Sequence, residues 1–476
     1  MLFNSIEFLL FLPIVFCLYW FAFRKLIWQN LFLIVASYIF YGWWDWRFLV
    51  LIAFSSVCSY FFGNLIKKEQ NKENKYGKLY LTLNIVINLT LLGIFKYYNF
   101  FVSSFVSAVS MLGFDFNVRT LHLILPIGIS FYTFQALSYT IDIYKKKIEP
   151  ASNPIEFFAF ISFFPQLVAG PIERATNLLP QIQRPRIFSY EQAADGTRQI
   201  LWGLFKKMVI ADNCAIIVNT IWNNYQNEDG MTLIVATILF AFQIYGDFSG
   251  YSDIAIGTGH LFGINLMQNF RFPFFSKTIA EFWRRWHISL NSWLIDYIYI
   301  PLGGGRVGKL RKVRNILIVF LTSGLWHGAN WTYIAWGGLY GLLMIPSTLK
   351  NKKTKEGIID NSIKGRLKDQ IKILLTFISF LAGLIVFRSN TISDAVLFYK
   401  RLLCDTSFII PDIDYTVFIY ILILLRFEWI HREKQFGLQL DLNKWYPALR
   451  YCVYILLMFS ILILSGKSTQ FIYFQF

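Results

Sequence analysis

The sequence predicts an all-α polytopic membrane protein, and three observations support this prediction. The 476 residues are 56% hydrophobic and only 15% charged, a balance that soluble globular proteins do not have. Aromatic side chains make up 19% of the chain, which fits aromatic belts at the membrane interfaces. About a dozen apolar stretches are long enough to cross a bilayer as helices.

These stretches follow one another along most of the chain. We expect membrane helices at residues 8–23, 28–46, 48–66, 79–110, 121–143, 208–222, 231–247, 315–346, 373–388, 415–431 and 447–465. The stretch 315–346 is long enough for two short passes. The first stretch has neither a basic leading segment nor a small-residue cleavage site, so we expect it to be a retained helix.

Charged loops predict the orientation of these helices. Loops rich in Lys and Arg face the cytoplasm, and the sequence has three: one from Lys67 to Lys78, one from Lys145 to Lys147, and one from Lys350 to Lys372. The loops 223–230 and 404–415 contain no Lys or Arg and should face outward. With residues 155–170 read as re-entrant, this parity places both termini outside the cytoplasm.

Net charge and cysteine content argue against nucleic-acid-binding, disulfide-rich and metal-binding classes of protein. Lys and Arg number 45 against 28 Asp and Glu, for a net charge of +17, which basic loops beside anionic membrane lipids explain. No basic segment belongs to a soluble domain, so we expect no nucleic acid among the partners. The five cysteines are scattered, and neither a disulfide framework nor a metal site is expected.

Residues 144–314 do not fit simple membrane spans. Proline, glycine and charged residues interrupt the apolar clusters in 144–207 and 248–314. Irregular backbone at membrane depth is tolerated only where protein buries it or where it lines a watery cavity. Within a single domain of residues 1–476, we therefore expect the functional site in this region of re-entrant and interfacial cytoplasmic segments.

His327 is the first candidate for catalysis. After Arg314, the stretch 315–346 that contains His327 has no charged residue, and an ionisable side chain at membrane depth usually faces a bundle interior or a cavity. Trp326 and Trp331 could wall a narrow channel, and three small neighbours would let a second backbone or an elongated ligand approach: Gly324, Gly328 and Ala329. The alternative is a core histidine bonded to a carbonyl.

His287 is the second candidate. Helical spacing would place Trp283, Trp286 and His287 on one face, with Arg284 and Arg285 elsewhere, as on an amphipathic helix at the cytoplasmic interface. The functional interpretation is a cavity mouth whose basic residues attract an anionic ligand such as a nucleotide-containing thioester. Those residues are Arg284, Arg285, Arg306, Lys309, Arg311, Lys312 and Arg314. The alternative is an ordinary interfacial helix with snorkelling arginines.

Asp247 and Asp253 lie in the sequence YGDFSGYSD. Carboxylates beside glycine and serine are usually helix caps, and this is the interpretation that we favour. The alternatives are that they orient a histidine or bind a cation.

Three motifs together resemble those of the membrane-bound O-acyltransferase family. They are FPQLVAGPIER at 164–174, FWRRWHISLNSWLIDYIYIPLGG at 282–304 and LWHGANWTYIAWGGLYG at 325–341. The chain looks most like the alginate O-acetyltransferase branch, near the peptidoglycan O-acetyltransferases and teichoic-acid D-alanyltransferases. The resemblance implies about a dozen transmembrane helices, with re-entrant and interfacial helices, around a central tunnel.

The resemblance also implies an activity and its residues. His327 maps onto the family's catalytic histidine, and His287 onto a second functional position. A funnel from the cytoplasm would accept acetyl-CoA as donor, with no tightly bound cofactor, and the acyl group would be delivered outside. We expect substrate contacts from residues in and beside the same motifs: Trp283, Arg284, Arg285, Trp326, Asn330, Arg306 and Arg311.

The C-terminal residues 466–476 end in the aromatic sequence FIYFQF. This ending resembles the terminal motif of acyl-relay partners in envelope-polymer acylation. By that resemblance, Tyr473 would enter the outer tunnel mouth, accept the acyl group and pass it to an extracytoplasmic partner transferase. The alternative is an aromatic anchor at the membrane interface.

We therefore expect a multi-pass enzyme of the bacterial inner membrane that O-acetylates an envelope or secreted polysaccharide with a partner O-acetyltransferase. The acceptor stays open between alginate, peptidoglycan and other glycans. A D-alanyl or other acyl transferase using a carrier-protein thioester is the alternative within the family. From other classes, a polysaccharide exporter and a non-catalytic scaffold are possible, although the sequence has no inverted repeat of the kind that exporters use.

Overall fold

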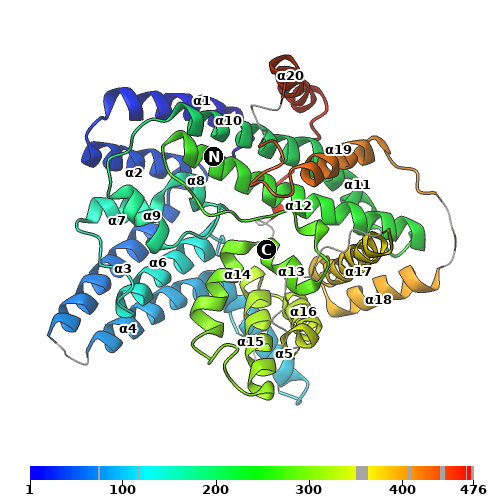
Figure 1. Ribbon diagram of the computed structural model, residues 1–476. Helices are drawn as coiled ribbons and strands as arrows, with labels where there is room; N and C mark the ends of the chain where they lie inside the picture. The colour runs from blue at the N-terminus through cyan, green and yellow to red at the C-terminus, as the bar shows by residue number, and fades with distance from the viewer. Residues whose placement is uncertain are drawn as a thin grey trace. The chain divides into compact units, whose positions relative to one another are not determined.

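The computed structural model describes residues 1–72, 76–114, 118–121, 123–349, 363–405, 407, 410–439, 445–467 and 469–472. Over these ranges the chain forms helices joined by turns and loops, and it contains no strand (Figure 1). The predicted all-α class is confirmed. The chain divides into two compact units that alternate along the sequence: Met1–Thr197 with Ile254–Met267, and Arg198–Asp253 with Gln268–Phe476. The expectation of one domain over residues 1–476, with its central region 144–314, stays a prediction.

The first unit contains most of the N-terminal helices. They are α1 (Ile6–Cys17), η1 (Leu18–Ala22), α2 (Leu26–Gly42), α3 (Phe48–Asn71), α4 (Tyr76–Leu92), η2 (Gly93–Tyr97), α5 (Tyr98–Ser110), α6 (Ile129–Tyr144), α7 (Pro154–Ser162), α8 (Phe164–Leu167) and α9 (Ala175–Ile182). The helix α10 (Tyr190–Leu204) begins in this unit and ends in the second.

Local sequence explains where several of these helices begin. The Ser5 side chain accepts a hydrogen bond from the Phe8 N–H at 3.3 Å and caps α1. The Asn153 side chain caps α7 in the same way, and Pro154 follows in the first turn, where its missing N–H has no intrahelical partner to lose.

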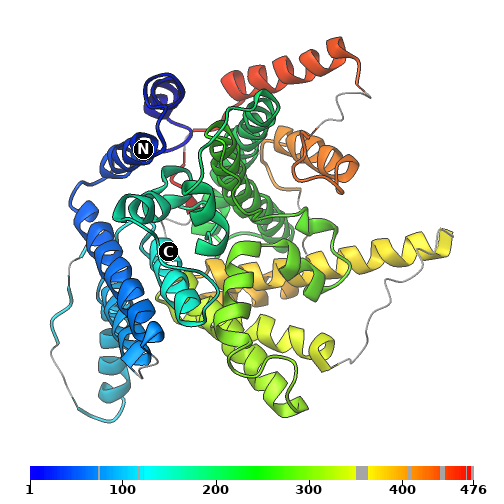
Figure 2. The ribbon, with the colours of Figure 1, turned by 60° about the vertical axis from the view of Figure 1, so that its left-hand side comes forward.

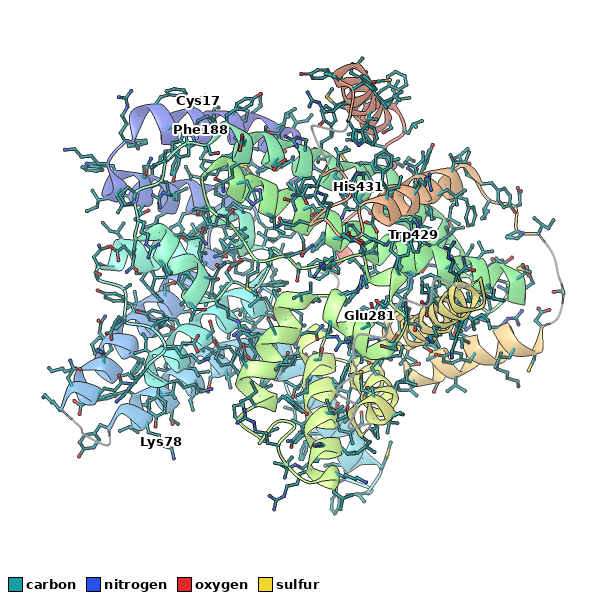
Figure 3. All side chains as sticks on the ribbon, viewed as in Figure 1. Cys17, Lys78, Phe188, Glu281, Trp429 and His431 are labelled. Carbon is teal, nitrogen blue, oxygen red and sulfur yellow. The ribbon has the colours of Figure 1, made fainter. Side chains whose placement is uncertain are left out.

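Phe188, labelled beside α1 in Figure 3, packs against the Trp20 ring at 5.5 Å.

Polar side chains join α3, α4 and α6 inside the first unit. The Ser55 hydroxyl donates to Asn88 at 2.6 Å, the Ser59 hydroxyl to Asn84 at 3.2 Å, and the Asn84 amide to Thr140 at 2.9 Å. Such polar contacts hold helices together where lipid provides no hydrophobic drive for their association. Each of the three helices therefore packs against the other two, and these hydrogen bonds satisfy polar groups between them.

The second unit contains the helices around both candidate histidines. They are η3 (Phe205–Ala211), α11 (Asp212–Asn223), η4 (Pro273–Phe275), α13 (Ile279–Arg285), α14 (Ile288–Leu294), η5 (Ile295–Tyr299), α15 (Lys309–His327), α16 (Trp331–Leu349), α17 (Ile363–Arg388), α18 (Ile392–Cys404), α19 (Thr416–Ile430) and α20 (Pro447–Ile463). The helix α12 (Gly230–Leu261) begins here and ends in the first unit. In this unit, α20 packs on η3 (Figure 2).

Several helices are suited to a membrane. Among the described residues, four stretches are long and apolar enough to cross one: Phe48–Asn71, Tyr76–Ser110, Gly230–Leu261 and Gly365–Arg388. Three shorter apolar helices are Ile6–Ala22, Leu26–Gly42 and Pro447–Ile463. The stretch 315–346 is divided between α15 and α16, and its reading as two short passes stays a prediction. The number of spans, their orientation, the re-entrant course of 155–170 and the tunnel stay predictions.

Candidate active site

His287 lies at a break between two short helices. α13 ends at Arg285 and α14 begins at Ile288, while His287 adopts left-handed φ and ψ angles of 46° and 53°. Residues other than glycine rarely adopt this conformation, and such strain concentrates at functional sites. The Ile288 N–H donates to the Asn269 carbonyl and the Arg271 N–H to the Arg285 carbonyl, both at 2.9 Å. These two hydrogen bonds fix the non-helical backbone at His287.

Asn269 also orients the imidazole of His287. Its Oδ1 lies 3.1 Å from Nδ1 of His287 and accepts the Ser289 hydroxyl at 2.9 Å, while its Nδ2 donates to the Ser252 hydroxyl at 3.0 Å. Because an amide oxygen only accepts, Nδ1 carries the hydrogen, and Nε2 of the neutral ring is the basic nitrogen. Sequence reasoning missed Asn269, since a single asparagine in a loop has no distinguishing pattern.

His327 is the last residue of α15, and Gly328 follows it. α15 and α16 lie side by side (Figure 1). A Cβ on Gly324 would lie 2.2 Å from the Tyr333 carbonyl oxygen, and one on Gly328 would lie 2.1 Å from the Tyr333 ring. No side chain fits at either position, so the predicted close approach of a second backbone is confirmed at Gly324.

The two imidazoles share one aromatic enclosure. Their ring centroids are 6.3 Å apart, and the Trp326 ring lies 5.6 Å from His287 and 5.2 Å from His327. Trp336 and Phe387 lie 5.1 Å and 5.4 Å from the His327 ring. Only 1% of His287 and 5% of His327 is exposed. The structure therefore brings the two predicted histidines together in an apolar interior.

The predicted amphipathic helix through His287 is wrong. Trp286 has extended backbone angles, so Trp283, Trp286 and His287 cannot share a helical face. The Trp283 ring packs against Trp336 at 5.6 Å, whereas the Trp286 ring stacks on Phe282 at 5.6 Å. The physical reason is the pairing of residues 269–271 with residues 285–288, which takes the backbone out of the helix and buries His287.

Trp331 and Asn330, two residues predicted to act beside His327, lie at the start of α16. Trp331, which we expected to wall a channel, is 56% exposed. The Asn330 Oδ1 accepts the Thr332 N–H at 3.0 Å at the start of α16, and its Nδ2 donates to the Asn390 carbonyl at 2.9 Å. Asn330 therefore joins the start of α16 to the turn between α17 and α18, and its contact with substrate stays a prediction.

The predicted basic residues lie at the surface of the second unit. Arg284 is exposed, and Arg285 pairs with Glu281, labelled on α13 in Figure 3, at 2.7 Å. Arg306, before α15, and Arg311, in its first turn, are exposed. Exposed cations attract an anionic donor through long-range electrostatics. The roles of these arginines, and those of the buried Trp283 and Trp326, in binding substrate stay predictions.

Asp247 and Asp253 are not helix caps, which corrects the interpretation that we favoured. Both lie inside α12, where Asp247 pairs with Lys207 at 2.7 Å and Asp253 pairs with Lys206 at 2.6 Å. The reason is long-range: buried lysines require carboxylate partners. Over the part of the chain that the structure describes, no group of three or more His, Cys, Asp or Glu side chains could hold a metal ion.

The C-terminal segment approaches His287 through two aromatic rings. The Phe471 ring lies 6.2 Å from the Phe248 ring, and Phe248 packs edge-on against His287 at 4.7 Å. Tyr473, the predicted acyl carrier, lies outside the described residues. Its role stays a prediction. Phe471, two positions before it, is separated from His287 by the Phe248 side chain.

The enclosure favours the neutral form of the His287 imidazole. Burial holds the pKa of His287 well below its usual value, and the nearby His327 lowers it further. A neutral imidazole can take a proton from an attacking hydroxyl, and burial maintains the form that this step requires. A helical membrane protein with two such rings in one apolar interior has the features of an enzyme that catalyses proton-coupled group transfer.

Comparison with known proteins identifies the family. Residues 38–352 match the sequence model of the membrane-bound O-acyltransferase family, and the chain belongs to this family. It is 39% identical over 393 residues to the probable alginate O-acetylase AlgI of Pseudomonas syringae pv. tomato, covering 82% of this chain and 73% of that protein.

Two further relatives carry other names. The chain is 39% identical over 374 residues to the peptidoglycan O-acetyltransferase of Helicobacter pylori, covering 72% of this chain and 70% of that protein. It is 30% identical over 236 residues to the teichoic acid D-alanyltransferase of Bacillus subtilis, covering 47% and 59% respectively. The family resemblance predicted from the three motifs is confirmed, and the chain is a membrane acyltransferase.

Replacing His287 by alanine is expected to lower acyl transfer by about 100-fold through lost positioning, with little loss of protein. The Asn269 Oδ1 would keep the Ser289 hydroxyl as a donor, so no buried acceptor would be left unsatisfied. The measurement is glycan-bound acetate per unit of membrane-inserted protein. A variant that fails to accumulate would instead assign His287 a structural role.

Proposed function

We propose that this acyltransferase moves acetyl groups from cytoplasmic acetyl-CoA across the bacterial inner membrane for O-acetylation of an envelope or secreted polysaccharide. An extracytoplasmic partner O-acetyltransferase would complete the transfer. The proposal is supported by the relatives, which are named for acetylation of alginate and of peptidoglycan. The single observation that carries the chemistry is the pair of buried imidazoles 6.3 Å apart.

The proposed reaction begins with proton transfer to His327. The attacking group is the Tyr473 phenol, whose proton passes to the neutral imidazole as the phenolate oxygen attacks the thioester carbonyl. The carbon–sulfur bond then breaks, and the thiolate leaves as CoA after taking the proton back from His327. Tyr473 is left as an aryl acetate ester, which the partner transfers to a sugar hydroxyl.

His287 supports this reaction from the second side of the enclosure. Its Nδ1 is held by Asn269, so Nε2 is the nitrogen that can serve the reacting group. A ring that is fixed before the substrate arrives loses little freedom during the reaction. We assign His287 to the lining of the donor side of the enclosure, where Nε2 can accept a hydrogen bond but cannot donate one, and we assign His327 to proton transfer.

The donor is tested with purified protein in lipid vesicles. We expect release of free CoA thiol with acetyl-CoA when acceptor and partner are present, and no turnover with a D-alanyl carrier-protein thioester. Turnover with the carrier protein alone would replace the proposed donor by that of the teichoic acid relatives. Turnover with neither donor, in protein that supports acetylation in cells, would also refute the proposed donor.

Reversing the charge at Arg306 and Arg311 together is expected to raise the KM for acetyl-CoA in this assay. Both side chains are exposed, and salt screens exposed charges over about 10 Å at 0.1 M. The rise in KM should therefore be larger at low salt than at high salt. An unchanged KM at both ionic strengths would contradict attraction of the donor by these arginines.

A further inference from the structure

Lys207 stands at the centre of a buried ion cluster in the second unit. Its ammonium lies 2.7 Å from Asp247 on α12 and 2.9 Å from Asp212 at the start of α11. All three side chains are almost completely buried, with 6%, 4% and 1% of the Lys207, Asp247 and Asp212 side chains exposed. One ammonium against two carboxylates leaves an excess negative charge, which is costly to bury unless other donors satisfy it.

The C-terminal segment 464–472, of which the structure describes residues 464–467 and 469–472, supplies those donors. The Ile472 N–H donates to Asp247 at 2.7 Å. The Thr469 hydroxyl and N–H donate to Asp212 at 2.5 Å and 3.4 Å, and the Thr469 carbonyl accepts from Lys207 at 3.2 Å. Hydrogen bonds to charged groups are stronger than neutral ones. The segment therefore completes the cluster, and its release would leave two buried carboxylates short of donors.

Two hydrogen bonds between uncharged groups fix the start of the same segment. The Gly466 N–H donates to the Met208 carbonyl at 3.0 Å, and the Asn213 amide donates to the Leu464 carbonyl at 2.9 Å. A Cβ on Gly466 would lie 2.8 Å from the backbone carbonyl carbon of Asp212. The segment thus lies directly on the backbone where η3 joins α11.

The segment ends beside the aromatic enclosure. The Phe471 ring lies 4.7 Å from Tyr251, and both Phe471 and Ile472 are 2% exposed. Asp247 and Tyr251 are one turn apart on α12. Asp247 accepts the Ile472 N–H and Tyr251 contacts the Phe471 ring, so α12 holds two adjacent residues of the segment. Phe248, between them on α12, packs against His287.

We propose that Lys207, Asp212 and Asp247 are positioning residues, which hold the segment 464–472 as a fixed arm and direct the chain end toward His287 and His327. This inference rests on the proposed function of Tyr473, which directly follows Ile472. The arm acts on the transfer step and does not contact the donor. Its loss is therefore expected to lower kcat while leaving the KM for acetyl-CoA unchanged.

A neighbouring ion pair provides a matched control. Lys206 pairs with Asp253 at 2.6 Å and donates to the Ser249 hydroxyl at 2.9 Å, and Gln199 donates to Asp253 at 2.8 Å. This pair is also buried and also joins η3 to α12. None of these contacts comes from the segment 464–472. Asp253→Asn therefore breaks a comparable buried ion pair without weakening the arm.

The test measures release of the arm and catalysis in the same variants. Ile472→Cys is introduced after Cys17, Cys58, Cys404 and Cys452 are replaced by alanine, and the same background without Ile472→Cys serves as the blank. We expect a maleimide to label the introduced thiol about tenfold faster in Asp247→Asn, with kcat for polymer acetylation reduced about tenfold. Gly466→Ala displaces the arm by steric contact alone and is expected to act in the same way.

The outcomes separate the arm from the proposed carrier. Unchanged labelling in both Asp247→Asn and Gly466→Ala, or equal effects in Asp253→Asn, would overturn the inference whatever Tyr473 does. Faster labelling with unchanged kcat would also overturn the positioning role. In that case, a loss of transfer in Tyr473→Phe would leave the proposed function standing, whereas full activity of Tyr473→Phe would refute the carrier as well.

Discussion

Replacing His327 by alanine is expected to lower acetylation of the polymer by at least about 100-fold, the smaller end of what a positioned general base contributes. The ring lies beside Trp326, Trp336 and Phe387, and no other histidine except His287 shares that enclosure among the described residues. The measurement is ester-bound acetate on the glycans of cells that carry the variant as their only copy, normalised to membrane-inserted protein.

A matched histidine elsewhere in the second unit separates catalysis from folding. His431, labelled beside α19 in Figure 3, is buried at 6% exposure, and its Nδ1 lies 3.0 Å from the Phe427 carbonyl oxygen. It is outside the aromatic enclosure, so His431→Ala should keep acetylation near the wild-type level. Unchanged acetylation in His327→Ala at equal protein level would refute the assignment of His327 as the base.

The site could be predicted from sequence only where the signal is local. His327 was predicted because an ionisable side chain in a stretch without charge is rare, and Gly324 because small residues permit close helix packing. Both signals lie within a few residues of the position that they describe. The structure confirms the close packing and places His327 in an apolar interior.

The break at His287 could not be predicted in this way. Residues 282–294 have the periodicity of one helix, and only the pairing of residues 269–271 with residues 285–288 shows that the helix ends at Arg285. That pairing is a tertiary contact, which overrides local helix propensity. Asn269 was missed for the same reason, because its partner His287 lies 18 positions away in the sequence.

The ion cluster shows how local composition can mislead. Asp247 lies beside glycine and serine, which favoured a helix cap, but its partners Lys207 and Ile472 are distant in the sequence. The contact between Asp247 and Ile472 joins residues separated by 225 positions. No pattern within one segment identifies such a pair, and the membrane environment raises its importance because an unpaired buried charge would be costly.

Tyr473→Phe is expected to eliminate acetyl transfer to the polymer without reducing the amount of protein. The change keeps the aromatic ring and removes only the hydroxyl, so it distinguishes a carrier from a membrane anchor. An aryl ester is more reactive than an alkyl ester, and the acetyl group on a phenol can therefore pass onward to a partner's hydroxyl. The measurement is polymer-bound acetate, with Tyr446→Phe, which alters a tyrosine that is 82% exposed, as the control.

Mass analysis tests the same step without the partner. Wild-type protein supplied with acetyl-CoA but no partner transferase should gain one acetyl group, located on Tyr473 by peptide analysis, because the ester has no acceptor to leave to. Tyr473→Phe should lack this acetyl group because it has no hydroxyl to accept it. His327→Ala should lack it because the base that activates the hydroxyl is absent. Full polymer acetylation by Tyr473→Phe would make the terminal motif a membrane anchor and would require transfer from the thioester directly to an outside acceptor.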